Sequence, residues 1–163
     1  MKYLYLIRHA KSSWKDENLA DFDRPLNKRG KRNAPFMAEV LKNNHIFPDY
    51  IVTSGANRAL STANIFCKIL EFDKSLMKID NKIYDATKQD LVEVVQKTPD
   101  DATTLFLFGH NPSFNEFANF FTDFELNIPT CGIYGIVFET SSWKDIAQCD
   151  LKEIFFDFPK RYH

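Results

Sequence analysis

The sequence contains little cysteine. Its three cysteines, Cys67, Cys131 and Cys149, are an odd number without the spacing of metal ligands, which argues against a disulfide framework or a zinc site. Cys67 falls within a helical pattern, so we expect it to be a small core residue. The sequence shows neither the pattern of a secretory signal nor a stretch long enough to span a membrane. These absences predict a cytoplasmic protein.

An excess of either charge is also missing. The chain has 21 Lys and Arg, 22 Asp and Glu and a formal net charge of −1, whereas nucleic-acid binding normally leaves a basic footprint. It has no glycine-rich loop with a lysine, and no carboxylate cluster of the kind that holds Mg²⁺. We therefore expect no nucleic-acid or membrane partner, no metal and no other cofactor.

What is present fits one soluble globular domain over residues 1–163. The hydrophobic content of 44% and the charged content of 26% are ordinary for such a protein, and no repeat, low-complexity segment or linker divides the chain. The 16 phenylalanines are unusual. Those in the 114–124 segment, Phe114, Phe117, Phe120 and Phe121, predict a buried aromatic helix face, and an exposed partner surface is the alternative.

Apolar runs alternate with amphipathic segments along the chain. Strand-like runs occupy residues 4–8, 50–54, 76–84, 103–108, 133–138 and 151–158, and helical patterns occupy residues 28–43, 56–70, 88–97 and 112–122, with Asn27 as the cap of the first helix. The last two strands leave no room for a crossover helix, so they must pair antiparallel if they are neighbours. The predicted fold is a three-layer α/β/α sandwich with a mostly parallel sheet and an antiparallel edge.

Cationic and imidazole side chains follow three of the predicted strands. The first strand ends in Arg8 and His9, the second leads into Arg58, and the strand at 103–108 leads into His110. Ligands of open α/β sheets bind beyond the carboxyl ends of the strands. We therefore expect these four side chains to meet at one edge of the sheet.

The position of Arg58 suggests the kind of ligand. It lies in the first turn of the helix predicted at 56–70, where the helix dipole favours negative rather than positive charge. A bound anion would account for this mismatch. Arginine matches phosphoryl oxygens bidentately and stays charged at any accessible pH, so Arg8 and Arg58 are the expected phosphoryl clamp.

A histidine beside such a clamp can attack phosphorus through a ring nitrogen if the ring is neutral, and neighbouring guanidinium charge favours the neutral form. His9 is the predicted nucleophile, which would form a covalent phosphohistidine that water hydrolyses. Its other ring nitrogen should donate to a backbone carbonyl. His110 is predicted to donate to the phosphoryl oxygens, and each histidine taken alone could also be structural. His45 lies far from any motif and is expected at the surface.

Four motifs in order carry a family resemblance: Leu6-Ile7-Arg8-His9-Ala10-Lys11-Ser12-Ser13-Trp14, then Arg24-Pro25-Leu26, then Thr53-Ser54-Gly55-Ala56-Asn57-Arg58-Ala59 with Thr62-Ala63, then Gly109-His110-Asn111-Pro112-Ser113. Together they resemble the histidine phosphatase superfamily, which is phosphoglycerate mutase-like, and in particular its SixA-type branch of protein phosphohistidine phosphatases. The resemblance runs from the first strand to about residue 115. It implies that His9 is the nucleophile and that His110 lies in the phosphate pocket.

The general acid is the open member of the site. Related enzymes that cleave phosphate esters use a carboxylate to protonate the leaving oxygen, and Asp85 is the acidic residue in the matching segment after Tyr84. A leaving imidazole needs little help, because its conjugate acid has a pKa of about 6.5. Asp85 is therefore either a general acid or a helix-capping residue, with Asp90 and Glu93 as more remote candidates.

Two further residues are candidates for substrate binding. Arg24 lies in the polar loop of residues 11–27, and it either borders the site or is a solvated loop arginine. Asn111 directly follows His110.

The expected function is metal-independent removal of phosphate from a phosphohistidine-bearing protein, such as a phosphotransfer domain. The segment between residues 70 and 103 leaves little chain for a lid, and an open site fits a phosphohistidine on a protein surface, with the loop at 11–24 supplying docking contacts. Phosphate or its mimics should occupy the same site. The alternatives are a broad-specificity phosphatase or phosphoramidase for small molecules and a catalytically silent module that binds phosphohistidine.

Overall fold

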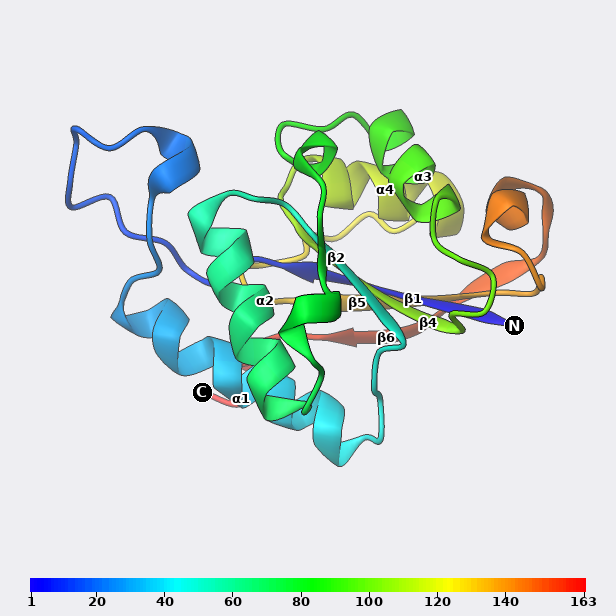
Figure 1. The fold of residues 1–163 in the computed structure, drawn as a ribbon, viewed down its shortest axis with the longest axis horizontal. Coiled ribbons are helices and arrows are strands. Elements are labelled where there is room, and N and C mark those ends of the chain that lie inside the picture. Colours follow the sequence, from blue (N-terminus) through cyan, green and yellow to red (C-terminus); the bar gives the residue numbers. More distant parts are fainter.

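A six-stranded sheet lies between two layers of helices in the computed structural model, which describes residues 1–163 (Figure 1). The strands are β1 (Lys2–Arg8), β2 (Tyr50–Thr53), β3 (Lys78–Ile79), β4 (Thr104–Gly109), β5 (Ile133–Phe138) and β6 (Leu151–Asp157). The helices are α1 (Lys28–Asn43), α2 (Asn57–Ile69), α3 (Lys88–Gln96) and α4 (Ser113–Thr122). The predicted three-layer α/β/α sandwich is confirmed.

The sheet has the order β3-β2-β4-β1-β5-β6, and its first four strands are parallel. β5 pairs antiparallel with β1, and β6 pairs antiparallel with β5, as the short connection between the two tail strands predicts. In the register of the central strands, Arg8 lies opposite Gly109 and Thr53 lies opposite Phe108. The carboxyl ends of β1, β2 and β4 therefore coincide at one edge of the sheet.

The central strands are buried on both faces, which is why they read as continuous apolar runs. Leu4 and Leu6 of β1 pack into the core beneath α3 and α4, whereas Tyr5 and Ile7 pack into the core formed with α1 and α2. Figure 1 shows α1 and α2 on one side of the sheet and α3 and α4 on the other. With both faces of the sheet covered by helices, ligands can approach the strands only at their ends.

The aromatic residues of α4 divide between core and surface. Phe114 and Phe117 are fully buried, so the predicted buried helix face is confirmed for them. Phe121 is half-buried, and Phe120 is 55% exposed, with the Lys88 ammonium 4.6 Å from its ring centroid. Phe120 is thus a single exposed aromatic residue next to a cation.

Of two local predictions, the helix cap at Asn27 is confirmed and the length of the strand over 76–84 is wrong. Asn27 caps α1 by accepting the Gly30 N–H at 2.9 Å, as predicted. The strand expected over 76–84 is much shorter, because β3 comprises only Lys78–Ile79 and a 3₁₀ turn follows at Asn81–Ile83. Both residues of β3 are exposed, so no buried face fixed a longer strand.

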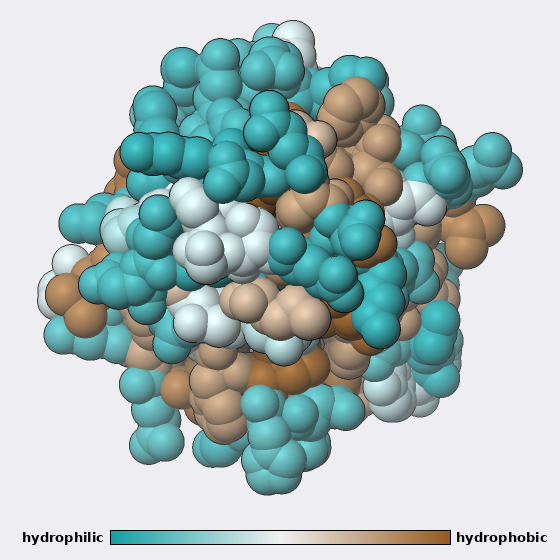
Figure 2. Space-filling view, turned by 90° about the vertical axis from the view of Figure 1, so that its right-hand side faces the viewer, coloured by the Kyte–Doolittle hydropathy of each residue, from teal (hydrophilic) through white to brown (hydrophobic).

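None of the helices combines the length and the apolarity that a membrane crossing would need. Figure 2 shows the end of the molecule at which β1 starts, where apolar residues lie among hydrophilic ones. Cys67 and Cys131 are buried, and all three cysteines are free. The expectation that Cys67 is a core residue is confirmed.

Candidate active site

The candidate site lies where β1, β2 and β4 end. The His9 N–H donates to the Gly109 carbonyl at 3.0 Å and thereby joins the end of β1 to the end of β4. The Ala10 N–H donates to Thr62 Oγ1 at 3.0 Å, and the Thr62 hydroxyl donates to the Arg58 carbonyl at 2.7 Å. These hydrogen bonds fix the first turn of α2 against the residues that follow β1.

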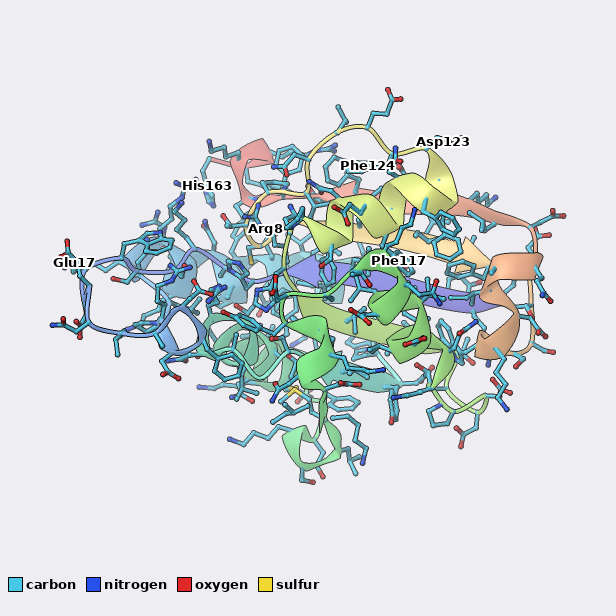
Figure 3. All side chains as sticks on the ribbon, turned by 90° about the horizontal axis from the view of Figure 1, so that it is seen from above. Arg8, Glu17, Phe117, Asp123, Phe124 and His163 are labelled. Carbon is cyan, nitrogen blue, oxygen red and sulfur yellow. The ribbon has the colours of Figure 1, made fainter.

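All four residues predicted to converge are found together. The rings of His9 and His110 have centroids 5.3 Å apart, and the two side chains belong to residues that are 7% and 6% exposed. The Tyr84 ring lies 5.5 Å from the His110 ring and 6.0 Å from the Arg58 guanidinium carbon. Arg8 is the last residue of β1, and its positive charge acts on both His9 and His110. Figure 3 shows it at the end of the strand.

The tautomer of His9 follows from its hydrogen bond. Nδ1 of the ring lies 2.8 Å from the Ala10 carbonyl oxygen, which can only accept. Nδ1 therefore carries the hydrogen, as predicted, and Nε2 of the neutral ring keeps its lone pair. A histidine in this tautomer presents a nucleophilic nitrogen.

His110 is oriented by Ser54. Its Nε2 lies 2.9 Å from the Ser54 hydroxyl oxygen, which already accepts the Ala56 N–H at 3.1 Å. The Ser54 hydroxyl has a second lone pair and its own hydrogen, so it can accept from Nε2 or donate to it, and the contact orients the ring in either tautomer. The sequence analysis did not assign this role to Ser54, although a hydroxyl directly after a strand end was visible in the sequence.

Burial keeps both imidazoles neutral. It lowers the pKa of His9 from 6.5 to about 3. The hydrogen bond to Ala10 opposes this shift, and His110, Arg58 and Arg8 each lower the pKa by a smaller amount. Burial, assisted by the positive charge of Arg58, lowers the pKa of His110 to about 4. The expected direction is confirmed, but desolvation rather than guanidinium charge is the main cause.

Asp21 is a site residue that the sequence analysis missed. Its carboxylate accepts hydrogen bonds from Arg58 and Arg24, each at 3.0 Å, and from the Tyr84 hydroxyl. Its carbonyl oxygen accepts a further bond from Arg58 at 2.7 Å. The Tyr84 hydrogen bond, followed by those of the arginines, lowers the pKa of Asp21 to about 2. Asp21 therefore stays ionised and orients the Arg58 guanidinium.

Arg24 is buried, with 7% exposure, so the alternative of a solvated loop arginine is wrong. Besides Asp21, it donates to the Ser12 hydroxyl at 2.7 Å, and its guanidinium carbon lies 3.4 Å from the Trp14 ring centroid. Arg24 thus holds the loop at 11–27 together and fixes Asp21.

Asn111 takes part in a network within the protein. Its amide nitrogen donates to the Ile128 carbonyl at 2.8 Å, and its oxygen accepts the Asn115 N–H at 3.1 Å. The Arg8 guanidinium donates to the same Ile128 carbonyl at 3.0 Å. Asn111 therefore supports the segment that orients Arg8, and its predicted contact with substrate stays a prediction.

Three buried polar atoms of the site have no partner within the protein. They are Nε of Arg8, Nε of Arg58 and Nδ1 of His110. An unpaired buried donor costs about 1–3 kcal/mol, and native proteins rarely leave one without a reason. The two Nε atoms are guanidinium donors, and two of them around one site favour a ligand rich in acceptor oxygens.

Asp85 follows Tyr84 directly and is exposed, with a backbone φ of 54°. The alternative that Asp85 caps α3 is wrong, because Thr87 accepts the Asp90 N–H and Asp90 completes the capping box. Glu93 pairs with Lys82 at 3.3 Å. The two remote candidates are thus engaged elsewhere, and the role of Asp85 as general acid stays a prediction.

The site shows no arrangement suited to a metal, since no group of three His, Cys, Asp or Glu side chains lies close enough to hold one.

A family model described as the histidine phosphatase superfamily (branch 1) matches residues 4–117. The chain belongs to the histidine phosphatase superfamily. The matched residues contain the four converging side chains, so the resemblance drawn from the sequence motifs is confirmed.

Curated relatives match different shares of the chain. An uncharacterized chloroplastic protein of Arabidopsis thaliana is 29% identical over 151 residues, which are 87% of this chain and 69% of that protein. Phosphoglycerate mutase 1 of Saccharomyces cerevisiae is 39% identical over 67 residues, which are 40% of this chain and 27% of the mutase. The similarity to the mutase is therefore confined to a part of each protein.

Solved structures of SixA proteins share the fold over nearly the whole chain. SixA of Agrobacterium tumefaciens superposes with a TM-score of 0.82 at 22% identity and covers 97% of this chain and 98% of its own. The protein histidine phosphatase SixA complexed with tungstate gives a TM-score of 0.84 at 15% identity, with 99% of both chains covered. These matches confirm the phosphoglycerate mutase-like fold, and they extend it past residue 115 to the antiparallel edge.

Proposed function

We propose that this histidine phosphatase removes phosphate from phosphohistidine on another protein. The observation that carries the proposal is the buried, neutral His9, whose Nε2 is left free by the hydrogen bond from Nδ1 to Ala10. Arg8, Arg58 and His110 surround it with donors that suit the oxygens of a phosphoryl group.

In the first step, His9 Nε2 attacks the phosphorus, and the bond between the phosphorus and the substrate imidazole breaks. The substrate ring, protonated on its other nitrogen, takes the electron pair of the broken bond and leaves as neutral imidazole. The positive charge that develops on the His9 ring is stabilised by the Ala10 carbonyl. In the second step, a water oxygen attacks the phosphorus, the bond to His9 breaks and phosphate leaves. Arg8 and Arg58 balance the negative charge of the phosphoryl oxygens in both steps.

The choice of phosphohistidine over a phosphate ester rests on the leaving group. An ester oxygen needs a proton from a positioned acid, whereas an imidazole, with a conjugate-acid pKa of about 6.5, departs almost unaided. Asp85 is exposed and forms no hydrogen bond to the four converging residues. A site so arranged favours the better leaving group. The SixA structures of the same fold, named for phosphohistidine phosphatase activity and in one case holding the oxyanion tungstate, support the proposal.

The test replaces His9 by alanine and compares it with a His45→Ala control, because His45 is exposed and lies outside the site. Both variants are assayed with a phosphohistidine protein, a small phosphoramidate and a phosphate monoester. We expect His9→Ala to lose turnover and the acid-labile phosphate that labels the wild-type enzyme, while the control keeps both. Retained labelling in His9→Ala would place the nucleophile elsewhere. Faster wild-type turnover of the small substrates would favour a broad-specificity phosphatase instead.

A further inference from the structure

A second basic cavity adjoins the candidate site. It has a volume of about 240 Å³, and Arg8 forms one wall of it, whereas His9, Arg58 and His110 do not line it. Lys11, Arg29 and Lys160 supply three more positive charges, and no acidic side chain lines the cavity. Four cations thus face one small space in a chain whose net charge is −1.

The added cations have no carboxylate partners. The ion pairs of the protein involve other residues, and none of them includes Lys11, Arg29 or Lys160. A neighbouring cavity shares Arg29 and Lys160 and adds the positive charge of Arg32 to the same surface. Like charges gathered without counter-charges repel one another, and a bound anion would relieve the repulsion.

The backbone holds these cations in place from three distant parts of the sequence. The Lys11 carbonyl accepts the Asn27 N–H at 3.0 Å, and it lies so close to α1 that a Cβ on Gly30 would stand 2.2 Å from it. At the other end of the chain, Lys160 belongs to the 3₁₀ turn Pro159–Arg161. That terminal segment is fixed to α1 by ring contacts of Tyr162 and His163 with Phe36. Figure 3 shows Arg8 and His163 toward the same end of the molecule.

Asn33 gives the cavity a buried polar group. It lies on α1, is 5% exposed and lines both cavities. Its carboxamide oxygen has no hydrogen-bond partner within the protein. This oxygen can only accept, so the group of Asn33 that could bind an anionic ligand is its amide nitrogen, which is a donor.

We propose that this basic cavity, formed by Lys11, Arg29, Asn33 and Lys160 next to Arg8, is a subsite for an acidic side chain of the protein substrate. The Asp or Glu would lie close in sequence to the phosphohistidine that occupies the candidate site. The inference rests on the proposed function. The size of the basic cavity supports a single side chain as its occupant. Its volume of about 240 Å³ is below the roughly 300–1,000 Å³ of pockets that take whole small molecules.

The test uses two synthetic peptides that carry a single histidine phosphorylated with phosphoramidate. One has Asp at the three positions on each side of the phosphohistidine, and the other has Asn at the same positions. Three extended residues reach about 10 Å, which suffices for an adjoining subsite. We expect wild-type kcat/KM to be about tenfold higher for the Asp peptide, as two or three partly exposed ion pairs would give.

Charge reversal then tests whether the preference for the Asp peptide comes from the cations of the basic cavity. In the double variant Arg29→Glu, Lys160→Glu the ratio of the two kcat/KM values should fall to about one or below. The matched control is Lys31→Glu, an equal change at an exposed position of α1 that lines neither cavity, and it should keep the wild-type ratio. A general loss of activity in a variant affects both kcat/KM values equally, so it does not change their ratio.

The outcomes separate the two proposals. Equal wild-type rates for both peptides, or a preference that survives the double charge reversal, would overturn the acidic subsite and leave the phosphohistidine phosphatase activity standing. Failure of the wild-type enzyme to dephosphorylate either peptide would overturn the proposed function and the subsite with it. Loss of the preference in Lys31→Glu as well would show a diffuse field effect and would also overturn the subsite.

Discussion

Acidification should leave both imidazoles of the site neutral until the pH falls well below the usual range of histidine. Burial lowers the pKa of His9 to about 3 and that of His110 to about 4. At pH 5 a histidine with a pKa of 3 is about 99% neutral, whereas one with the ordinary value of 6.5 is about 3% neutral. The nucleophilic form of His9 should therefore persist at pH 5 in the folded protein.

The same shifts reduce stability in acid. A histidine whose folded pKa is lowered binds fewer protons in the folded than in the unfolded state, so its contribution is complete above pH 6.5 and is lost as the pH falls toward the folded value. Between pH 8 and pH 5, His9 and His110 should each lower the free energy of unfolding by about 2 kcal/mol. Carboxylates contribute little in this window, because they protonate mainly below it.

Urea denaturation at pH 8 and pH 5 measures this loss, and NMR titration of the histidine ring protons measures the midpoints directly. The variants His9→Gln and His110→Gln keep a hydrogen-bonding amide but cannot titrate. Each should lose about 2 kcal/mol less than the wild type between the two pH values. A ring-proton midpoint near 6.5 for His9, or an equal loss of stability in all three proteins, would refute the reasoning.

Three substitutions test other features of the site and its frame. Asp21→Asn removes the carboxylate that orients Arg58. We expect kcat/KM for a phosphohistidine peptide to fall about tenfold, which corresponds to the loss of one charged hydrogen bond. Unchanged kinetics would contradict the orienting role of Asp21. Gly30→Ala should destabilise the protein by about 1–3 kcal/mol in urea, opposite in sign to helix propensity, because the new Cβ would lie 2.2 Å from the Lys11 carbonyl oxygen. Asp85→Asn should slow hydrolysis of a phosphate monoester about 100-fold but that of phosphohistidine less than about threefold, and equal losses would argue against the leaving-group explanation.

The sequence predicted those parts of the fold in which a periodic pattern and a local cap agree. The pattern over 28–43 with Asn27 as its cap corresponds to α1, and the antiparallel tail follows from the short connection between its strands. The four converging residues were predictable because each directly follows a strand or opens a helix. The adjacency of β2, β4 and β1 in the sheet, which the structure shows, then brings them together.

Contacts made by irregular chain were beyond sequence reasoning. Asp21 lies in a polar loop without periodicity, and its partners Arg58 and Tyr84 are 37 and 63 residues away. Nothing local to Asp21 distinguishes it from Asp16 or Asp23 in the same loop. The direction of the histidine pKa shifts was predictable from the neighbouring arginines, but their main cause, burial, depends on packing that only the structure shows.

Burial of His9 has a consequence for the proposed mechanism that the arginines alone would not produce. Two guanidiniums and one carboxylate give the site a net positive charge, which attracts a phosphoryl group whether or not the imidazoles are protonated. A protonated His9 would add to this attraction, but it would have no lone pair with which to attack phosphorus. Because burial keeps His9 unprotonated, the site binds the anion less tightly than a protonated histidine would allow. In return, His9 keeps the lone pair with which it attacks the bound phosphoryl group.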